Sequence, residues 1–223
     1  MNQINEFTLM EHSSDAVSIN DETFRRHGIT GVYSPIGDRS AQQATVALMV
    51  EAFRTKLPVE TRSESGFAVS TTGMAHPLLH GGLVVVAGQP YFRNKALADQ
   101  ASLQGIAAAL ATGYLDYSQA IFQQLYGSFC CAIIDTSEHR VLLAIDRLGQ
   151  NSLYYHSAGP ALHFGSSAGA ALAGTEGVPS LADQGIYNYL YFHMVPSPGS
   201  IYRGLGKIPP RITLYSTTSS VSW

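Results

Sequence analysis

Short apolar runs recur along most of the chain and predict a protein rich in β-strands. The runs are bounded by Gly, Asp, Asn or Pro and span residues 31–35, 66–70, 82–88, 129–135, 140–145, 152–156, 161–165 and 212–216. Helical spacing of apolar residues is strongest at 41–56, 101–113, 117–126 and 181–192. Short strands in hairpin-like succession, with helices grouped among them, favour a layered α+β fold over a βαβ repeat.

Length and charge narrow the classes of function. A chain of 223 residues fits one sizeable domain, and its net charge of -3 provides no basic surface for nucleic acid or anionic lipid. Charged residues make up 13% of the chain, against roughly 25% in ordinary soluble domains. The low share suggests that another domain covers part of the surface.

The cysteines and the N-terminus indicate a reduced, cytoplasmic protein. Cys130 and Cys131 are adjacent in a predicted strand, where neighbouring side chains point to opposite faces and do not readily form a disulfide. The N-terminus lacks a basic start, and no apolar stretch approaches the ~18 residues of a membrane span. We therefore expect neither a signal peptide nor a membrane segment.

Two local motifs have structural interpretations that we prefer over catalytic ones. GSSAG at 165–169 fits the G-x-S-x-G nucleophile elbow, but Asp183 and His193 lie too close in sequence to complete a hydrolase triad around Ser167. We interpret Ser166 or Ser167 as a helix cap. His76 and His80 have the spacing of helical metal ligands, yet Pro77 interrupts them and no acidic or cysteine ligand is near, so no metal site is expected.

The segment DRLGQNSLYYH, residues 146–156, lies between two predicted strands. Asp146 and Arg147 head a turn that contains Gly149, and such a pair can stabilise a loop by charge-assisted hydrogen bonds. We expect both side chains to serve structure, with Leu148 directed inward.

Four segments in order resemble the N-terminal glutaminase domain of asparagine synthetase, a class II glutamine amidotransferase of the N-terminal-nucleophile hydrolase fold. The first, LYGSF at 125–129 with Asp135, resembles the family's Leu-x-Gly-x-Phe strand ending in Asp. The second, AIDRLGQNSLYYH, is similar to its Asp-Arg-Leu-Gly hairpin. The others are HFGSSAGAALAG and VPSPGSIYRGLGKIPPRITLYS, which resemble the family's Phe-x-Ser junction and its Pro-rich loop. The resemblance implies a four-layer αββα sandwich of two antiparallel sheets over residues 27–223, after an N-terminal extension at 1–26.

The resemblance also implies that the active-site residues have been replaced. The family's domain opens with Cys-Gly-Ile-x-Gly, whose cysteine is the first residue after processing and uses its own α-amine as base. This chain has His27-Gly28-Ile29-Thr30-Gly31, preceded by 26 residues. The oxyanion-hole turn Asn-Gly-Glu corresponds to Ala87-Gly88-Gln89, and the glutamine-binding Arg-Gly-Pro-Asp survives at best around Arg62. We therefore expect a vestigial pocket without a catalytic residue.

A degenerate first domain occurs in relatives such as β-lactam synthetase and the lasso-peptide cyclases, where the substrate itself supplies the amine. By that resemblance, the expected partner is an ATP-pyrophosphatase synthetase domain, in cis or in trans, which would hold ATP and Mg; no cofactor is expected in this domain. The sequence does not decide whether the chain also forms a homodimer. Two alternatives remain: an active glutaminase that uses Cys130 or Cys131, and a stand-alone binding module that uses the vacated pocket.

Overall fold

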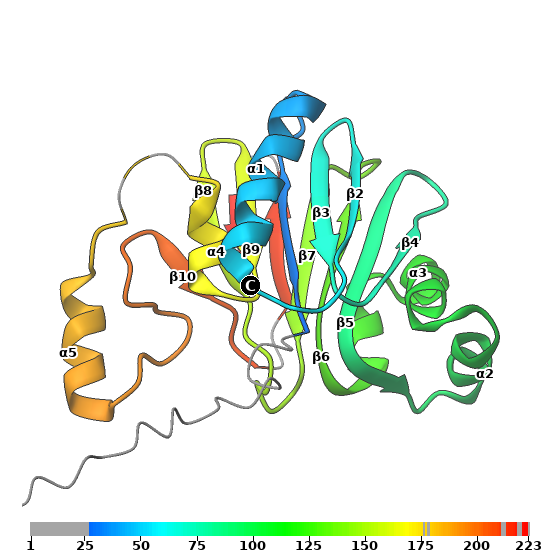
Figure 1. The fold of residues 1–223 in the computed structure, drawn as a ribbon. Coiled ribbons are helices and arrows are strands. Elements are labelled where there is room, and N and C mark those ends of the chain that lie inside the picture. The colour runs from blue at the N-terminus through cyan, green and yellow to red at the C-terminus, as the bar shows by residue number, and fades with distance from the viewer. Residues whose placement is uncertain (1–26, 176, 178, 211–212, 218–219, 223) are drawn as a thin grey trace, which may run out of the picture.

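The computed structural model describes residues 27–175, 177, 179–210, 213–217 and 220–222. It is an αββα sandwich in which two antiparallel sheets face each other and helices cover their outer faces (Figure 1). The fold class predicted from the sequence is therefore confirmed. The predicted extension at 1–26 lies outside the described residues.

Each sheet contains six described strands, and every described pairing is antiparallel. The first sheet has the order β10 (Leu205–Lys207), β8 (Tyr154–Ala158), β9 (Ala161–Gly165), β1 (Ile29–Tyr33), β3 (Phe67–Thr71) and β2 (Glu60–Glu64). The second has the order β12 (Ser220–Ser222), β11 (Thr213–Thr217), β7 (Arg140–Ile145), β6 (Leu125–Asp135), β5 (Gly82–Phe92) and β4 (Met74–Pro77). The predicted adjacency of β6 and β7 is confirmed.

Helices α1 (Arg39–Phe53) and α4 (Ala168–Ala173) pack on the first sheet, and α2 (Lys95–Gln104) and α3 (Ile106–Tyr117) pack on the second. The core is correspondingly divided between the space between the sheets and the space under each helical layer. Cys130 packs between the sheets and Cys131 packs under α3, which confirms that the adjacent thiols point to opposite faces. Within the described residues, no helix combines the length and the apolar character needed to cross a bilayer.

Three elements differ from the sequence-based expectation for identifiable reasons. The helix expected at 101–113 is divided at Gly105, whose φ of 91° ends α2 and starts α3. The helix expected at 117–126 is a 3₁₀ segment, Ser118–Gln124, followed directly by β6. Strand β2 was not predicted because its sequence ETRSE is polar and mostly exposed at the sheet edge.

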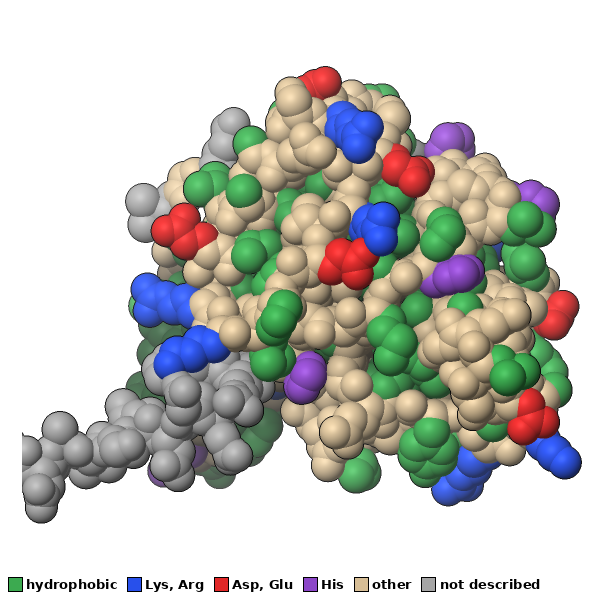
Figure 2. All heavy atoms as spheres, turned by 45° about the vertical axis from the view of Figure 1, so that its right-hand side comes forward, with side chains coloured by type: hydrophobic (Ala, Val, Ile, Leu, Met, Phe, Trp, Pro, Cys, Tyr) green, Lys and Arg blue, Asp and Glu red, His purple; other side chains and the backbone are tan. Residues whose placement is uncertain are grey.

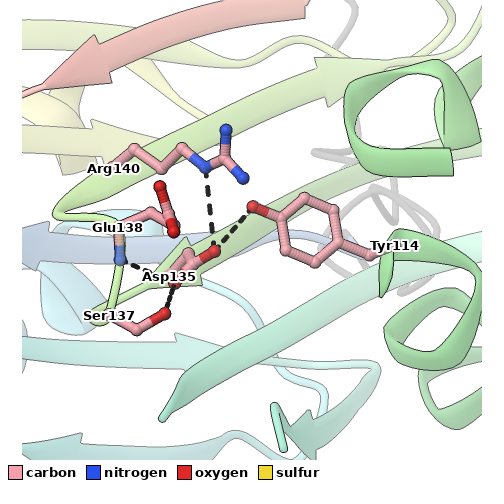
Figure 3. Close-up of polar contacts among 5 residues, drawn as sticks. All are labelled: Tyr114, Asp135, Ser137, Glu138 and Arg140. Carbon is pink, nitrogen blue, oxygen red and sulfur yellow. Dashed lines mark hydrogen bonds and ion pairs between the residues drawn. The ribbon is translucent and has the colours of Figure 1, made fainter. Parts of the chain in front are cut away.

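The β6–β7 hairpin and α3 are joined by a buried carboxylate (Figure 3). Asp135 accepts hydrogen bonds from the Tyr114 hydroxyl at 2.8 Å, the Ser137 hydroxyl at 2.7 Å and the Glu138 amide at 3.0 Å. The Arg140 Nε lies 3.7 Å from the same carboxylate. Burial alone raises the pKa of Asp135, but the hydrogen bonds outweigh it, and the net pKa lies below the usual value. This network fixes the end of the sandwich away from the site described next.

Candidate functional site

The site lies at the start of β1, where the chain is closely packed against its neighbours. Gly28 donates from its amide to the Thr72 hydroxyl at 2.9 Å, and its carbonyl accepts from the Thr72 amide at 3.1 Å. A Cβ at Gly28 would lie 2.5 Å from Phe53 and 2.7 Å from Ser166. This close packing explains why glycine occupies position 28 at the entrance to the strand.

His27 lies exposed at the edge of a cavity of about 410 Å³. The cavity is built from five parts of the fold: the segment before β1, the end of α1, the paired strands β5 and β6, the loop after β7 and the junction before α4. Its lining residues are His27, Phe53, Gly88, Gln89, Ser128, Gln150, Asn151, Ser152 and Ser166. None of these is Asp, Glu, Lys or Arg, so the described part of the cavity lining offers hydrogen-bonding groups without a fixed charge.

The loop after β7 is held by Asp146, which is 1% exposed. Its carboxylate accepts from the amides of Leu148 at 3.1 Å, Gln150 at 3.0 Å and Asn151 at 2.9 Å, and from the Asn151 side chain at 3.1 Å. Burial alone raises the pKa of Asp146, but these donors outweigh it, so the net pKa lies below the usual value. The same Asn151 side chain donates to the Ser128 hydroxyl at 2.8 Å, which connects the loop to β6 and shapes the cavity wall.

Arg147 and Gly149 also have structural contacts. The Arg147 guanidinium donates to the Gln123 carbonyl at 2.8 Å and stacks 4.0 Å from the centre of the Tyr126 ring. Gly149 has a φ of 66°, and a Cβ there would lie 2.8 Å from Pro210. Leu148, expected to point inward, is instead 80% exposed, because the turn directs its amide toward Asp146 and its side chain to solvent.

The residues aligned with the oxyanion turn are divided between cavity and core. Gly88 and Gln89 line the cavity, whereas Ala87 is buried between the sheets opposite Cys130. Gly88 has a φ of 104°, and a Cβ there would lie 2.4 Å from the Ser128 carbonyl. This backbone geometry therefore requires glycine at position 88, and the adjacent Ala87 has no side-chain donor.

Arg62 does not line the cavity. It lies on the edge strand β2, with an exposed side chain whose guanidinium contacts Glu60 at 2.5 Å. The pocket predicted from the sequence is therefore brought together in part: His27, Gly88 and Gln89 line it, Gly28 packs beside it, and Ala87 and Arg62 lie elsewhere.

Cys130 is the thiol nearest to the cavity, but it is enclosed. Its Sγ lies 3.4 Å from the hydroxyl of Ser166, which lines the cavity and accepts from the Ile29 amide at 2.9 Å. Cys130 is 0% exposed, and burial raises its pKa to about 11. Because the thiolate is the nucleophilic form, this cysteine is poorly suited to attack an amide.

The remaining motifs have structural roles. Ser167 caps α4 by accepting from the Ala170 amide at 3.1 Å, as the helix-cap interpretation predicted. Asp183 forms an ion pair with Arg203 at 2.8 Å. His76 lies on β4 rather than on a helix, and the described residues contain no group of three His, Cys, Asp or Glu able to hold a metal ion.

Sequence reasoning did not assign six cavity residues to the site: Phe53, Ser128, Gln150, Asn151, Ser152 and Ser166. Gln150, Asn151 and Ser152 belong to the segment 146–156, which the sequence analysis interprets as structural. Ser128 and Ser166 lie inside recognised motifs, LYGSF and HFGSS, so their proximity could have been inferred from the fold those motifs imply. Phe53 is the last residue of α1 and has no sequence signal that marks it as a site residue.

The comparisons with known proteins agree with this architecture. Among solved structures, the glutamine phosphoribosylpyrophosphate amidotransferase of B. subtilis, complexed with ADP and GMP, is similar with a TM-score of 0.51 and 12% identity. The structure of the allosteric regulatory enzyme of purine biosynthesis is similar with a TM-score of 0.53 and 11% identity. At these identities the likeness concerns the fold alone. Both alignments cover 87% of this chain and 48% of the other, so the chain spans about half the length of these neighbours.

The search of curated proteins finds no match. The family model for the glutamine amidotransferase domain matches residues 99–222, more than half of the chain. The matched range includes β6, β7 and the Asp146 loop, and begins after His27 and Gly88. Because the matched range covers more than half of the chain, this match shows that the chain belongs to the glutamine amidotransferase domain family.

Proposed function

We propose that this domain has kept the amidotransferase fold, has lost glutamine hydrolysis, and serves an ATP-dependent, amide-forming synthetase of the asparagine synthetase type. One observation carries the proposal: the residue before Gly28, at the edge of the cavity, is His27. In a mechanism of this type the nucleophile is a Cys, Ser or Thr whose own α-amine acts as base. His27 has neither a hydroxyl nor a thiol, and its nitrogen is in a peptide bond to Arg26.

The cavity lining supports the same conclusion. Glutamine has a charged α-amine and a charged α-carboxylate, and burying either without a partner of opposite charge is costly. Among the residues that the structure describes, the lining contains no carboxylate and no Lys or Arg to pair with them. Ala87 also lacks the side-chain donor of the family's oxyanion hole, and loss of one such donor costs about 10²–10³ in rate even when a nucleophile is present.

The proposed partner is a synthetase domain, in cis or in trans, that adenylates a carboxylate and lets an amine displace AMP. When the substrate supplies that amine, ammonia from glutamine is unnecessary, and loss of the glutaminase chemistry costs the reaction nothing. ATP and Mg are expected in that partner. The coexistence of retained scaffold residues such as Asp146 with a substituted nucleophile position supports a scaffolding role in a larger synthetase.

Two measurements test this proposal. Isothermal titration of the purified chain with L-glutamine should give no saturable heat, because the charged groups of glutamine have no partners of opposite charge among the described cavity residues. The coding DNA that follows codon 223, or an adjoining gene, should encode a Ser-Gly-Gly-x-Asp-Ser pyrophosphate loop. Saturable glutamine binding would contradict the loss of the substrate site, and absence of a synthetase gene would favour the stand-alone binding module.

A further inference from the structure

Helix α5 (Asp183–Phe192) presents large apolar side chains to solvent. Six residues on and just after it are each between 54% and 71% exposed, and we call them the α5 patch: Tyr187, Tyr189, Leu190, Tyr191, Phe192 and Met194. The helix stands beside the sandwich, beyond β10 (Figure 1). A helix with apolar residues on most sides is normally enclosed by other parts of a protein.

The return loop of the same segment holds α5 in place. The Ala182 amide donates to the Ile201 carbonyl at 2.8 Å, and Arg203 binds the Leu181 carbonyl and the Asp183 carboxylate, both at 2.8 Å. Gly185 permits this packing, because a Cβ there would lie 2.6 Å from the Ser200 carbonyl. These contacts fix the orientation of the helix through its first turn and leave the α5 patch uncovered.

The patch is ordered by contacts among its own rings. Tyr187 and Tyr191 stack with centroids 6.2 Å apart and planes 7° apart, and Phe192 meets Tyr191 edge-on at 4.8 Å. Rings already held in place lose little conformational entropy when a partner binds, which favours a specific interface.

The size and charge of the patch suit association with itself. With about 200 Å² per side chain, the six residues expose roughly 700 Å². This exceeds the ~300–600 Å² patches of typical monomers and approaches the ~800 Å² that each partner contributes to a stable interface. Between Leu181 and Arg203 the charged side chains are Asp183 and Arg203, which neutralise each other, so two such surfaces do not repel. The lack of further basic residues is unlike helices that bind anionic lipid.

We propose that the α5 patch is the contact surface of a homodimer and that its occupant is a second copy of this chain. In a two-fold arrangement the α5 helices of the two copies lie side by side, so the same residues face each other across the axis. Pairing two protruding helices covers one side of each and brings another side of each toward the body of the other copy. The tyrosine rings are then buried with their hydroxyls at the rim, as in many protein interfaces.

Sedimentation velocity of the full chain between about 1 and 100 µM tests the proposal. The expected result is a reversible dimer of twice 23.9 kDa. Tyr187→Glu combined with Tyr191→Glu should weaken dimerisation by at least about 100-fold, because two charges would be desolvated in each half of the interface. The matched control is Leu103→Glu on α2, at an 86% exposed position outside the patch, which should leave dimerisation unchanged.

Hydrogen exchange on the unmodified chain provides a test that does not depend on how the variants fold. Backbone amides of Asp183–Phe192 should become more protected as protein concentration rises, while those of Lys95–Gln104 should not change. A monomer at 100 µM, a dimer insensitive to the double variant, or a dimer broken by Leu103→Glu would overturn the proposal. A monomeric result would mean that something other than a second copy covers the α5 patch. Further protein beyond this domain is one such cover, because the alignments account for only 48% of each structural neighbour.

Discussion

At the scale of single residues, Asp146 shows most clearly what the domain has retained. Its carboxylate is buried and accepts four N–H groups from the loop that forms one wall of the cavity. Hydrogen bonds to a charged acceptor each contribute roughly 1.5–3 kcal/mol, and leaving the donors unpaired adds a cost. A residue with these contacts stabilises the site whether or not the site is catalytic.

Replacing Asp146 with Ala should therefore lower the free energy of unfolding by about 3 kcal/mol, which corresponds to roughly 6–12 °C in Tm. Differential scanning calorimetry measures the change, and Asp116→Ala, at an exposed position on α3, provides the control. An unaltered Tm for Asp146→Ala would mean that the loop does not depend on this carboxylate.

His163 should make stability depend on pH. It is buried on β9, and burial, with a smaller contribution from His156, lowers its pKa to about 4. The unfolded chain binds the proton near pH 6.5, so it holds more protons than the folded chain between pH 6.5 and 4. Stability should fall by about 1.4 kcal/mol per pH unit as pH decreases through this window.

The carboxylates of Asp135 and Asp146, whose pKa values are lowered, lose their contribution only below about pH 4, so their effect is separable. His163→Gln should flatten the dependence of Tm on pH between 6.5 and 4. If the variant kept the slope of the wild type, another group would have to be responsible.

The thiol of Cys130 gives a residue-scale test of the alternative nucleophile. With no exposure and a pKa of about 11, it should resist iodoacetamide at pH 7.5 in the folded protein and react only after unfolding. Mass spectrometry of native and denatured samples distinguishes the two states. Stoichiometric modification of Cys130 in the native protein would show that the thiol is accessible and would support an active glutaminase.

At the scale of elements, the sequence predicted the parts whose pattern is dictated locally. The sequence predicts the β6–β7 hairpin and the Asp-Arg-Leu-Gly loop after β7, because apolar strands and polar turns alternate within a short stretch. Strand β2 was missed because an exposed edge strand has no apolar face, and the break at Gly105 was missed because it depends on backbone dihedral angles. The prediction that Arg62 lies in the pocket was wrong for a related reason. Motif spacing does not determine which position a strand takes in a sheet, and Arg62 lies on the edge strand β2.

The paired strands β5 and β6 form the floor of the cavity through a close backbone contact at Gly88. Gly88→Ala would place a Cβ 2.4 Å from the Ser128 carbonyl at a φ of 104°, so it combines a steric clash with backbone strain. We expect a loss of at least about 3 kcal/mol in chemical denaturation. Gly159→Ala is the matched control, because its φ of 59° is also left-handed but no atom lies within 4 Å, and it should cost only about 1–2 kcal/mol. Equal costs for the two variants would contradict the packing described here.

At the scale of the whole molecule, the amidotransferase-type sandwich has a surface low in charge. Figure 2 shows a face on which acidic and basic side chains are scattered singly or in small groups among apolar and uncharged ones, in keeping with the 13% charged composition. The low share of charged residues predicts that part of the surface is covered by other protein. The α5 patch fits this prediction because its large apolar side chains are exposed. The sequence pattern alone does not predict which partner binds the α5 patch or which residues line the cavity. Both depend on side chains that the fold brings together from distant segments.

We propose that this amidotransferase fold does not hydrolyse glutamine, because the resemblance assigns His27 to the nucleophile position and 26 residues precede it. The most direct measurement is glutamine-dependent ammonia release by purified protein whose intact mass has been determined. We expect an N-terminus at Met1 or Asn2 and no ammonia above the blank, both for the wild type and for His27→Cys. A new thiol would still lack a free α-amine and a side-chain donor at Ala87. A product that begins at His27, or measurable ammonia release by the wild type, would contradict the proposal.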